Sequence, residues 1–502
     1  MPSQVDLLLI NPNNRKRIYQ SLASELTAIE PPIWAGLMAT FMRQKGYSVQ
    51  ILDACADNLE PAEIAEQVAA IEPLLVAIVV YGHQPSASTQ VMAGGSAVCS
   101  AVKKQIPSQK MIIVGGHVAA LPERSLREED TDFIASGEGL YTLSDLITTL
   151  KTAQPDYSQV RGLWYFEGSE VCSNAGAPLV QDLDSELPGI AWDLLPMEKY
   201  RAHNWHCFDG SSRHPYAALY TTLGCPFRCS FCCIQAPFKE GEALLGQTGN
   251  SYRYWSLDHV IQEIDILVNQ YGVRNLKIAD EMFVLNAKHV LGICDRIIER
   301  GYDLNIWAYA RVDTVQEQML DTLKRAGVNW LALGIEAASD RVRDNVHKEI
   351  GQTDIYKTIR KIRNAGINVI GNYIFGLPED NFESMQATLD LALELNCEFA
   401  NFYSTMAYPG SQLYNLALRK GWELPSSWAG YSQHAFESLP LRTQYLSAAQ
   451  VLVFRDNAFQ SYFSSPHYLK MINEKFGKGT VQHIKKMAAH KLERKISKGT
   501  HH

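Results

Sequence analysis

Three cysteines at short spacing are the side chains of this sequence best suited to metal chemistry. Cys225, Cys229 and Cys232 form a C-x3-C-x2-C loop. Thiols on one short loop can converge on one metal centre, and both iron and zinc accept thiolate ligands. A structural zinc site requires a fourth Cys or His at matching spacing, and the bacterial ferredoxin motif requires other intervals and a fourth cysteine. Neither pattern accompanies this loop, so we expect an iron centre with one position open for a substrate.

Length and composition describe a globular protein of two or three domains. The chain has 502 residues, of which 46% are hydrophobic and 20% charged. These values exclude a small binding module and a disordered chain. The net charge of −8 gives no basic field for nucleic acid or anionic lipid. The longest apolar stretch, residues 74–81, is too short to cross a bilayer, and the N-terminus lacks the pattern of a signal peptide. We therefore expect a cytoplasmic protein without nucleic-acid or membrane partners.

The ten cysteines of such a chain should mostly be reduced, which favours metal binding and catalysis over disulfides. Cys233 adjoins Cys232 in the chain, so its side chain should point away from the metal centre. We expect Cys233 to pack in the core as a small apolar residue.

The first 150 residues alternate between apolar strand patterns and helical patterns. Strands are predicted at residues 5–10, 47–52, 75–81, 111–114 and 133–135, with a helix at 32–45. Continuous apolar strands separated by helices predict a parallel sheet that is covered on both faces. Ligands of such sheets bind beyond the carboxyl ends of the strands. The predicted ends carry Asn11, Asp53, Tyr81-Gly82-His83, Gly115-Gly116-His117 and Gly137-Glu138-Gly139.

A second alternation begins near residue 216, after a connector with a predicted hairpin at 162–170. Its predicted strands are residues 217–222, 276–279, 305–310, 330–334, 368–375 and 398–404, and helical spacing is found, for example, at 257–268 and 287–298. Six strand and helix pairs predict a barrel or an incomplete barrel, whose chemistry belongs at the C-terminal strand ends. The cysteine loop directly follows the first of these strands. Beyond residue 416 the sequence is mainly helical, and Trp428 to His434 is expected to pack within a helical cap.

In this context the cysteine loop resembles that of the radical S-adenosylmethionine (SAM) superfamily, specifically its cobalamin-binding class of methylase-like (class B) enzymes. The spacing of the cysteines, the aromatic Phe231 before the last one, the barrel-like alternation and the preceding flavodoxin-like pattern carry the resemblance. It covers the chain from Val5 to about Tyr414. The implied α/β architecture is a flavodoxin/Rossmann-like cobalamin-binding domain (1–150), a connector (151–213), a partial (β/α)6 radical SAM barrel of TIM type (214–415) and a C-terminal helical region (416–502).

The resemblance also implies cofactor contacts in the barrel. Cys225, Cys229 and Cys232 would hold a 4Fe-4S cluster whose remaining iron binds the amino and carboxylate groups of SAM, with Phe231 near the adenine. The strand ends supply further candidates by their order in the chain, namely Asp280 and Glu281 near the methionyl ammonium, Arg311 on the methionyl carboxylate, Glu336 beside them, and Asn372 and Tyr408 to Ser411 on the ribose and adenine sides. Taken singly, these residues have plainer alternatives: a helix cap for Asp280 or Glu281 and a salt bridge between Arg311 and Glu336.

The cobalamin-binding resemblance rests on Asp53, on the Gly115-Gly116-His117 turn, and on Ser136-Gly137-Glu138-Gly139. The chain departs from the better-known pattern because it has no D-x-H-x-x-G segment, so we expect no protein imidazole on the lower face of cobalt. His83 and His117 are the alternative axial ligands, although loop or corrin-edge contacts are the favoured interpretation. Gln84 and the residues up to Thr89 would lie along the corrin or its tail. A doubly wound sheet without a ligand remains the plain alternative.

Three functional hypotheses follow. As the family implies, the reduced cluster would donate an electron to SAM, and the resulting 5'-deoxyadenosyl radical would abstract hydrogen from an unactivated carbon before methylcobalamin delivers a methyl group. The second hypothesis keeps these cofactors but replaces methylation with cyclisation or another oxidative rearrangement. The third is a non-catalytic iron–sulfur electron-transfer protein. Expected partners are a small-molecule substrate, which the motifs do not identify, and an electron donor such as flavodoxin or ferredoxin.

Overall fold

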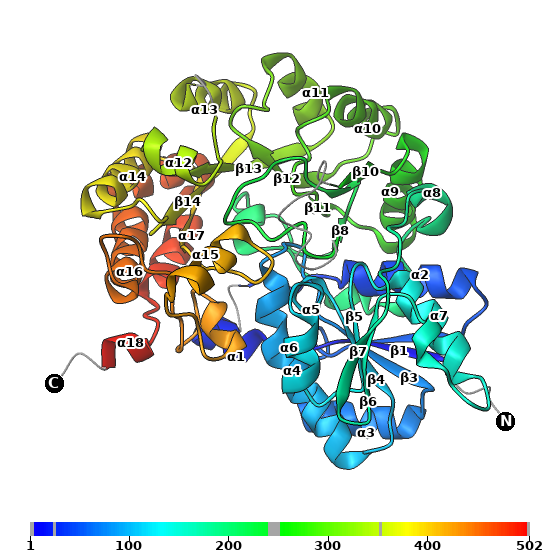
Figure 1. Cartoon of the computed structure of the whole chain (residues 1–502). Coiled ribbons are helices and arrows are strands. Elements are labelled where there is room, and N and C mark those ends of the chain that lie inside the picture. The colour runs from blue at the N-terminus through cyan, green and yellow to red at the C-terminus, as the bar shows by residue number, and fades with distance from the viewer. Residues whose placement is uncertain (1–4, 24–26, 239–250, 351–353, 499–502) are drawn as a thin grey trace.

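The computed structural model describes residues 5–23, 27–238, 251–350 and 354–498, and it contains two large β-sheets flanked by helices (Figure 1). The first sheet has the order β2-β1-β3-β4-β5-β6-β7. Its strands are β1 (Leu7–Asn11), β2 (Val49–Asp53), β3 (Leu75–Val79), β4 (Met111–Val114), β5 (Phe133–Ala135), β6 (Leu163–Glu167) and β7 (Glu170–Ser173). The first five strands pair in parallel, in the order 2-1-3-4-5 of flavodoxin-like sheets. The predicted fold class of this half is confirmed.

The apolar runs of this sheet are continuous because both faces are covered. Leu7 and Leu9 face the core that contains α2, whereas Leu8 and Ile10 face a second core against α3 and α4. The helices of this half are α1 (Arg15–Tyr19), α2 (Ile33–Gln44), α3 (Pro61–Ile71), α4 (Ala87–Gln105), α5 (Gly116–Ala120), α6 (Pro122–Glu128) and α7 (Leu140–Leu150). The short loops between these elements place the carboxyl ends of the strands at one edge of the sheet.

The predicted hairpin forms, but it belongs to the first sheet. Strand β6 pairs antiparallel with β5, with Tyr165 opposite Phe133, and β7 completes the hairpin. A short helix, α8 (Leu183–Glu186), follows in the remainder of the connector. The domain boundaries at residues 150, 213 and 415 stay predictions, although this pairing attaches part of the connector to the N-terminal half.

The second sheet contains six parallel strands in the order β8-β11-β12-β13-β14-β15, which is an open, incomplete barrel. The strands are β8 (Tyr216–Leu219), β11 (Asn275–Ile278), β12 (Asn305–Arg311), β13 (Val328–Glu336), β14 (Asn368–Phe375) and β15 (Phe399–Ser404). The partial barrel predicted from the sequence is therefore confirmed. One boundary is wrong: the strand predicted at 217–222 ends at Leu219, and residues Thr222–Gly224 form a separate strand, β9, antiparallel to β10 (Tyr252–Tyr254).

Helices cover the outside of the barrel and its C-terminal end (Figure 1). They are α9 (Leu257–Tyr271), α10 (Ala287–Glu299), α11 (Leu320–Arg325), α12 (Asp340–Asn345), α13 (Ile355–Asn364), α14 (Phe382–Leu395), α15 (Gln412–Lys420), α16 (Ala448–Ser464), α17 (Pro466–Ala489) and α18 (Lys495–Lys498). The Ser256 side chain caps α9 by accepting from His259 N, and Gly272 ends it in a left-handed conformation. No helix within the described residues has both the length and the apolar character needed to cross a membrane.

The two halves share one hydrophobic core and several polar contacts. Residues of both sheets belong to the same buried cluster, which includes Leu7 of β1 and Leu276 of β11. Glu138 and Arg253 form an ion pair across the interface, with 2.6 Å between Oε1 and Nη2. The 3-10 turn Trp428–Tyr431 packs on α4 of the N-terminal half. The C-terminal region therefore contacts both halves, which fixes the position of the barrel mouth relative to the first sheet.

Candidate functional site

The cysteine loop begins where β9 ends, and its path is held by backbone contacts. Gly224 has a φ of +91°, and a Cβ at this position would clash with the carbonyl oxygen of Ser251. Cys225 N donates to the same oxygen at 3.0 Å. Gln235 joins both sides of the loop, because its Nε2 donates to Cys225 O at 2.8 Å and its Oε1 accepts from Ser251 N at 3.2 Å. Gln235 was not among the predicted site residues.

The three thiols of the loop lie close enough to influence one another. Burial raises the pKa of Cys225 to about 12. Burial also raises the pKa of Cys229, against the cations of Lys348 and Arg311, and that of Cys232, to which negative charge on Cys225 and Cys229 adds. Among the described residues, no three His, Cys, Asp or Glu side chains converge closely enough for a single metal ion. A 4Fe-4S cluster does not require such convergence, since each thiolate binds a different iron. Positive iron would also stabilise these buried thiols as thiolates.

Arg311, at the end of β12, lies beside the cysteine loop. Its Nη1 is 4.0 Å from Cys229 Sγ, and its guanidinium stacks on the Phe227 ring at 4.0 Å from the centroid. Nε and Nη2 each donate to one carboxylate oxygen of Asp313 at 2.9 Å. The salt-bridge alternative for Arg311 is thus observed, but its partner is Asp313 and not Glu336.

Glu336 forms a different buried ion pair, with Lys348. The two charged atoms lie 2.9 Å apart, and each side chain is only 8% exposed. Glu336 has a φ of +64°, a strained conformation for a residue with a side chain, at a register shift between β13 and β14. Burial opposes the charge of Lys348, but Glu336 and Cys229 raise its pKa above the ordinary value. Sequence reasoning missed Lys348 because no motif surrounds it.

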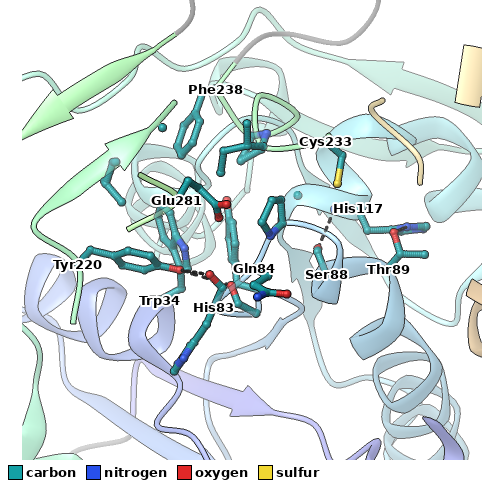
Figure 2. Close-up of a pocket in the computed structure, with 18 of the residues that line it drawn as sticks. Trp34, His83, Gln84, Ser88, Thr89, His117, Tyr220, Cys233, Phe238 and Glu281 are labelled. Carbon is teal, nitrogen blue, oxygen red and sulfur yellow. Dashed lines mark hydrogen bonds between the residues drawn. The ribbon is translucent and has the colours of Figure 1, made fainter. Parts of the chain in front are cut away.

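The two carboxylates after β11 have different environments. Asp280 is fully buried and accepts from Thr221 N at 2.6 Å, Thr221 Oγ1 at 2.5 Å and Thr222 N at 3.2 Å. These bonds turn the chain between β8 and β9, which explains the strand break that the sequence did not predict. Glu281 instead points into a cavity (Figure 2), and burial raises its pKa to about 8.

The remaining predicted SAM contacts lie at neighbouring strand ends. Asn372 on β14 donates to Leu333 O at 3.3 Å and accepts from Asn401 Nδ2 at 2.9 Å. Phe231 packs against apolar residues that follow β13 and β14, including Leu377. Tyr408 donates to Tyr431 O at 3.1 Å. Cys233 is buried, as expected for a packing role, but it also borders the cavity.

A cavity of about 550 Å3, counted to its open mouth, lies between the two halves. Figure 2 shows side chains of the N-terminal half, such as Trp34 and His83, facing barrel residues such as Tyr220 and Glu281. The walls of the cavity come from the loops after β3 and β4, from the ends of β8 and β11, and from the chain after the cysteine loop. The lining residues include Tyr81, Gly82, Gln84, Ser88, Thr89, Gly116, His117, Ile234, Pro237 and Phe238. The cavity therefore adjoins the cysteine loop.

Several residues predicted to contact cobalamin line this cavity, but others do not. His83, Gln84, Gly116 and His117 are part of its wall. Gly115 behind them has a φ of +154° and lies against Val80 O, where a Cβ would clash. The predicted cobalamin contacts thus form two groups: residues that line the cavity, and residues whose side chains or backbone stabilise the fold.

Asp53 and Glu138 belong to the second group. Asp53 is 2% exposed, and it accepts from Asn11 Nδ2 at 2.7 Å and from Tyr200 OH at 2.8 Å. Glu138 accepts from Val180 N at 2.9 Å in addition to its ion pair with Arg253. Gly137 has a φ of +70°, and the nearest described atom to the position of a Cβ is Pro237 O, at 3.8 Å.

The two candidate axial histidines also differ. His83 Nε2 is hydrogen-bonded to Pro31 O at 2.7 Å, whereas Nδ1 lies 3.2 Å from Glu30 Oε1 without forming a hydrogen bond among the described residues. His117 is 1% exposed, and its Nδ1 lies 3.1 Å from Thr89 Oγ1. Its buried Nε2 has no hydrogen-bond partner among the described residues. Burial lowers the pKa of His117 to about 3, so the ring is neutral at physiological pH.

Comparisons with known proteins match both halves. Residues 19–147 match the B12 binding domain and residues 219–392 match the radical SAM superfamily. An uncharacterized methyltransferase of Pyrococcus horikoshii is 29% identical over 88% of this chain and 89% of its own length. An anaerobic magnesium-protoporphyrin IX monomethyl ester cyclase of Cereibacter sphaeroides is 25% identical over 91% and 70%, respectively.

A solved structure shares the whole architecture. The radical SAM methyltransferase TsrM from Kitasatospora setae, with cobalamin and a 4Fe-4S cluster bound, matches with a TM-score of 0.66 and 16% identity, covering 92% of this chain and 90% of that chain. At this identity the likeness concerns the fold. Fold and family matches together define a B12-binding domain joined to a radical SAM barrel. The chain belongs to the cobalamin-binding class of the radical SAM superfamily.

The cofactors of this class are a 4Fe-4S cluster, SAM and cobalamin, and the observed residues fit them. Three mutually close thiols are the donor set of the cluster. The cations of Arg311 and Lys348 near Cys229 suit an anionic group such as the carboxylate of SAM. The backbone of Gly116 lines the cavity, and His117 Nε2 lacks a hydrogen-bond partner among the described residues, which suits the amide-rich edge of cobalamin.

Proposed function

We propose that this protein methylates an unactivated carbon of a small molecule as a cobalamin-dependent radical SAM enzyme. One observation carries the proposal: the chain runs from Cys232 directly into the cavity wall at Cys233, Ile234, Pro237 and Phe238. A cluster on the three cysteines and a cobalamin against the first domain would therefore face a common space. The methyltransferase relative from Pyrococcus horikoshii, similar along 88% of this chain, supports methylation.

When bound, the cluster and SAM supply a carbon radical, and cobalamin supplies the methyl group. The chain contributes binding and orientation. Cys225, Cys229 and Cys232 would hold the cluster, with Gln235 fixing the path of their loop. Arg311 would meet the SAM carboxylate, and its geometry is preset because Phe227 and Asp313 hold the guanidinium plane.

The neighbouring residues would complete the SAM site. We place Glu281 near the ammonium of SAM, and Phe231 and Asn372 on the adenine and ribose sides. Glu336 would act through Lys348, whose position it fixes by a buried ion pair. Asp280 would act through the backbone, because both carboxylate oxygens already accept hydrogen bonds from the turn after β8.

On the cobalamin side, the proposed contacts are Gln84, Gly116, His117 and the backbone of Gly137. Gly115 would shape the turn, and Asp53 and Glu138 would keep the neighbouring loops in place. His83 would not ligate cobalt, because its Nε2 is hydrogen-bonded to Pro31 O and its Nδ1 faces the carboxylate of Glu30. Aromatic residues around the cavity, such as Trp34 and Phe238, would exclude water from the reacting radicals.

The second candidate is a rearrangement without methyl transfer, because the Cereibacter sphaeroides relative is a cyclase. A single experiment separates the two. The full chain is reconstituted anaerobically with iron, sulfide and cobalamin, and incubated with trideuteromethyl SAM and a metabolite extract of a deletion strain. Methylation predicts a metabolite heavier by a trideuteromethyl group together with 5'-deoxyadenosine. Formation of 5'-deoxyadenosine and an oxidised metabolite without deuterium would support rearrangement and contradict methylation.

The proposal includes an external one-electron donor of flavodoxin or ferredoxin type, because the cluster must be reduced before each radical is formed. It places the protein in the cytoplasm, where such a donor is kept reduced. Its substrate is a small molecule, and we expect no nucleic-acid or membrane partner. Comparing product formation with flavodoxin and with dithionite as the reductant in the reconstituted assay tests whether the protein donor does more than supply electrons.

A further inference from the structure

Two tyrosine hydroxyl groups inside the barrel have no role in the proposed function. Tyr309 lies on β12 two residues before Arg311, and Tyr403 lies on β15 two residues after Asn401. Side chains at alternate positions of a strand point to the same face of its sheet. Tyr309 therefore shares the face of Arg311. Tyr403 shares the face of Asn401, whose Nδ2 donates to Asn372. Both tyrosines thus face the side of the barrel where we place SAM.

Tyr309 also contacts the N-terminal half. Gln84, which lines the cavity in Figure 2, donates from Nε2 to the hydroxyl oxygen of Tyr309. The Trp307 ring packs edge-on against the Tyr309 ring at 5.0 Å between centroids, which fixes the orientation of the phenol. Tyr309 therefore connects Gln84, a proposed cobalamin contact, with the strand end that carries Arg311, a proposed SAM contact. A substrate that reacts between these cofactors would lie beside this hydroxyl group.

Both phenols carry a proton that is available to a ligand. The Tyr309 oxygen accepts from Gln84, but neither its proton nor that of Tyr403 has an acceptor among the described residues. Burial raises the pKa of Tyr309 well above 10, with a further increase from Tyr403, and it also raises the pKa of Tyr403. Both groups are therefore protonated donors at physiological pH. Both side chains keep some accessible surface despite this burial, as expected at the edge of an internal space.

The charged groups around the two hydroxyl groups are already paired. The cations near them form the ion pairs Arg311–Asp313, Lys348–Glu336, Arg455–Asp456 and Lys277–Glu30. Burial raises the pKa of Glu281 to about 8, so this carboxyl group is mostly uncharged at neutral pH. An anionic group of a substrate would need a cation of its own at this point, whereas an uncharged oxygen needs only a hydrogen-bond donor. The surroundings therefore favour an uncharged acceptor as the partner of the two phenols.

We propose that Tyr309 and Tyr403 bind the substrate by donating hydrogen bonds to an uncharged oxygen close to the carbon that is methylated. The inference rests on the proposed function and adds the substrate class: a molecule with a hydroxyl, carbonyl or ether oxygen beside the reacting carbon. Tyr309 donates from β12, and Tyr403 donates from β15, which β13 and β14 separate from β12. Donors on two separate strands would hold the reacting carbon in one orientation between the cofactors.

The test compares the reconstituted full chain with three variants, using trideuteromethyl SAM and the metabolite extract of the deletion strain. Tyr309→Phe and Tyr403→Phe each remove one hydroxyl group and keep the ring. Tyr216→Phe is the matched control, because the hydroxyl group of this barrel tyrosine already donates to Glu30 Oε1 at 3.1 Å. Cluster iron and bound cobalamin are measured first, so that a defect in folding or loading is recognised. The readout is the amount of deuterium-labelled metabolite formed per 5'-deoxyadenosine.

The inference predicts that Tyr309→Phe and Tyr403→Phe each lower this ratio about tenfold, because a buried oxygen of the substrate loses its donor while SAM is still cleaved. Tyr216→Phe leaves the ratio unchanged, and NMR of the labelled metabolite shows an oxygen on the methylated carbon or on its neighbour. An unchanged ratio in either fully loaded variant would overturn the inference, as would an equal decrease in Tyr216→Phe or a metabolite without such an oxygen. If the parent chain itself formed no labelled metabolite, the proposed methylation would be wrong, which is a distinguishable result.

Discussion

At the scale of single residues, the site combines groups that are ready for a ligand with groups whose bonding capacity is already used. His117 Nε2 is buried without a hydrogen-bond partner among the described residues, and Glu281 lines the cavity, whereas Asp53 and Asp280 each accept several hydrogen bonds from the protein. A buried polar group with satisfied hydrogen bonds costs little stability, whereas an unpaired one lowers the free energy of unfolding by about 1–3 kcal/mol. The unpaired His117 Nε2 is therefore among the groups that we assign to a cofactor.

The Glu336–Lys348 pair gives a prediction at this scale. Glu336→Gln leaves the Lys348 ammonium buried without a counter-charge, so we expect a loss of about 3 kcal/mol or more in the free energy of unfolding. Thermal unfolding followed by circular dichroism measures it. The exposed pair Glu317–Lys361 is the control, and Glu317→Gln should cost less than about 1 kcal/mol. Equal losses in the two variants would contradict the buried-pair account.

At the scale of helices and strands, local sequence patterns predicted most of what the structure contains. The apolar runs of β1 and β3 and the helical spacing of α9 and α10 depend on neighbours in the chain, and they were predicted to within a few residues. The break between β8 and β9 was missed because it depends on Asp280, 59 residues beyond Thr221. Lys277 and Glu30, 247 residues apart, illustrate the same limit for the site. Hydrogen-bond and ion-pair partners so far apart in the chain cannot be recognised from a local sequence pattern.

Helix α9 gives a pH-dependent prediction. Its Glu263 accepts from Ile190 N at 3.2 Å and Trp192 Nε1 at 2.9 Å, and burial raises its pKa to about 7. A carboxyl group whose pKa is raised by folding favours the folded state at low pH, and this stability is lost as the pH rises through 7. The melting temperature should therefore fall between pH 5 and 8, and fall less in Glu263→Gln.

Glu299→Gln on the exposed surface of α10 is the control for this titration. It should keep the pH dependence of the parent chain, because it removes an exposed carboxyl group of the same type and leaves Glu263 unchanged. A parallel pH profile of Glu263→Gln and the parent chain, measured by differential scanning fluorimetry in one buffer system, would refute the role assigned to Glu263.

At the scale of the whole molecule, the arrangement of the two halves creates the reaction space. The carboxyl ends of both sheets supply the loops around the cavity, as expected for parallel sheets. The Glu138–Arg253 ion pair and the shared apolar core hold these edges together, and Trp428 packs edge-on against His117 at 4.3 Å between ring centroids. The C-terminal region is thus coupled to the proposed cobalamin wall, a contact that its sequence did not indicate.

The ion pair between the halves can be tested directly. Glu138 and Arg253 are only 3% and 10% exposed, so Glu138→Gln leaves a buried guanidinium and should cost about 3 kcal/mol. Hydrogen exchange should increase at β5 and β10 together, because the pair joins the loops beside these strands. Arg43–Asp193 is the exposed counterpart, and Asp193→Asn should leave exchange unchanged. Faster exchange in only one half of Glu138→Gln would show that the pair does not hold the interface.

The central claim is that three cysteines hold a cluster with one iron open to SAM. The most direct measurement is electron–nuclear double resonance of the reduced, reconstituted full chain with SAM labelled with nitrogen-15 at its amino group. Our account predicts a nitrogen-15 coupling to the cluster in the parent chain and in Cys233→Ala, and loss of cluster iron in Cys225→Ala, Cys229→Ala and Cys232→Ala. A fully loaded cluster whose spectrum shows no nitrogen-15 coupling on addition of SAM would contradict it.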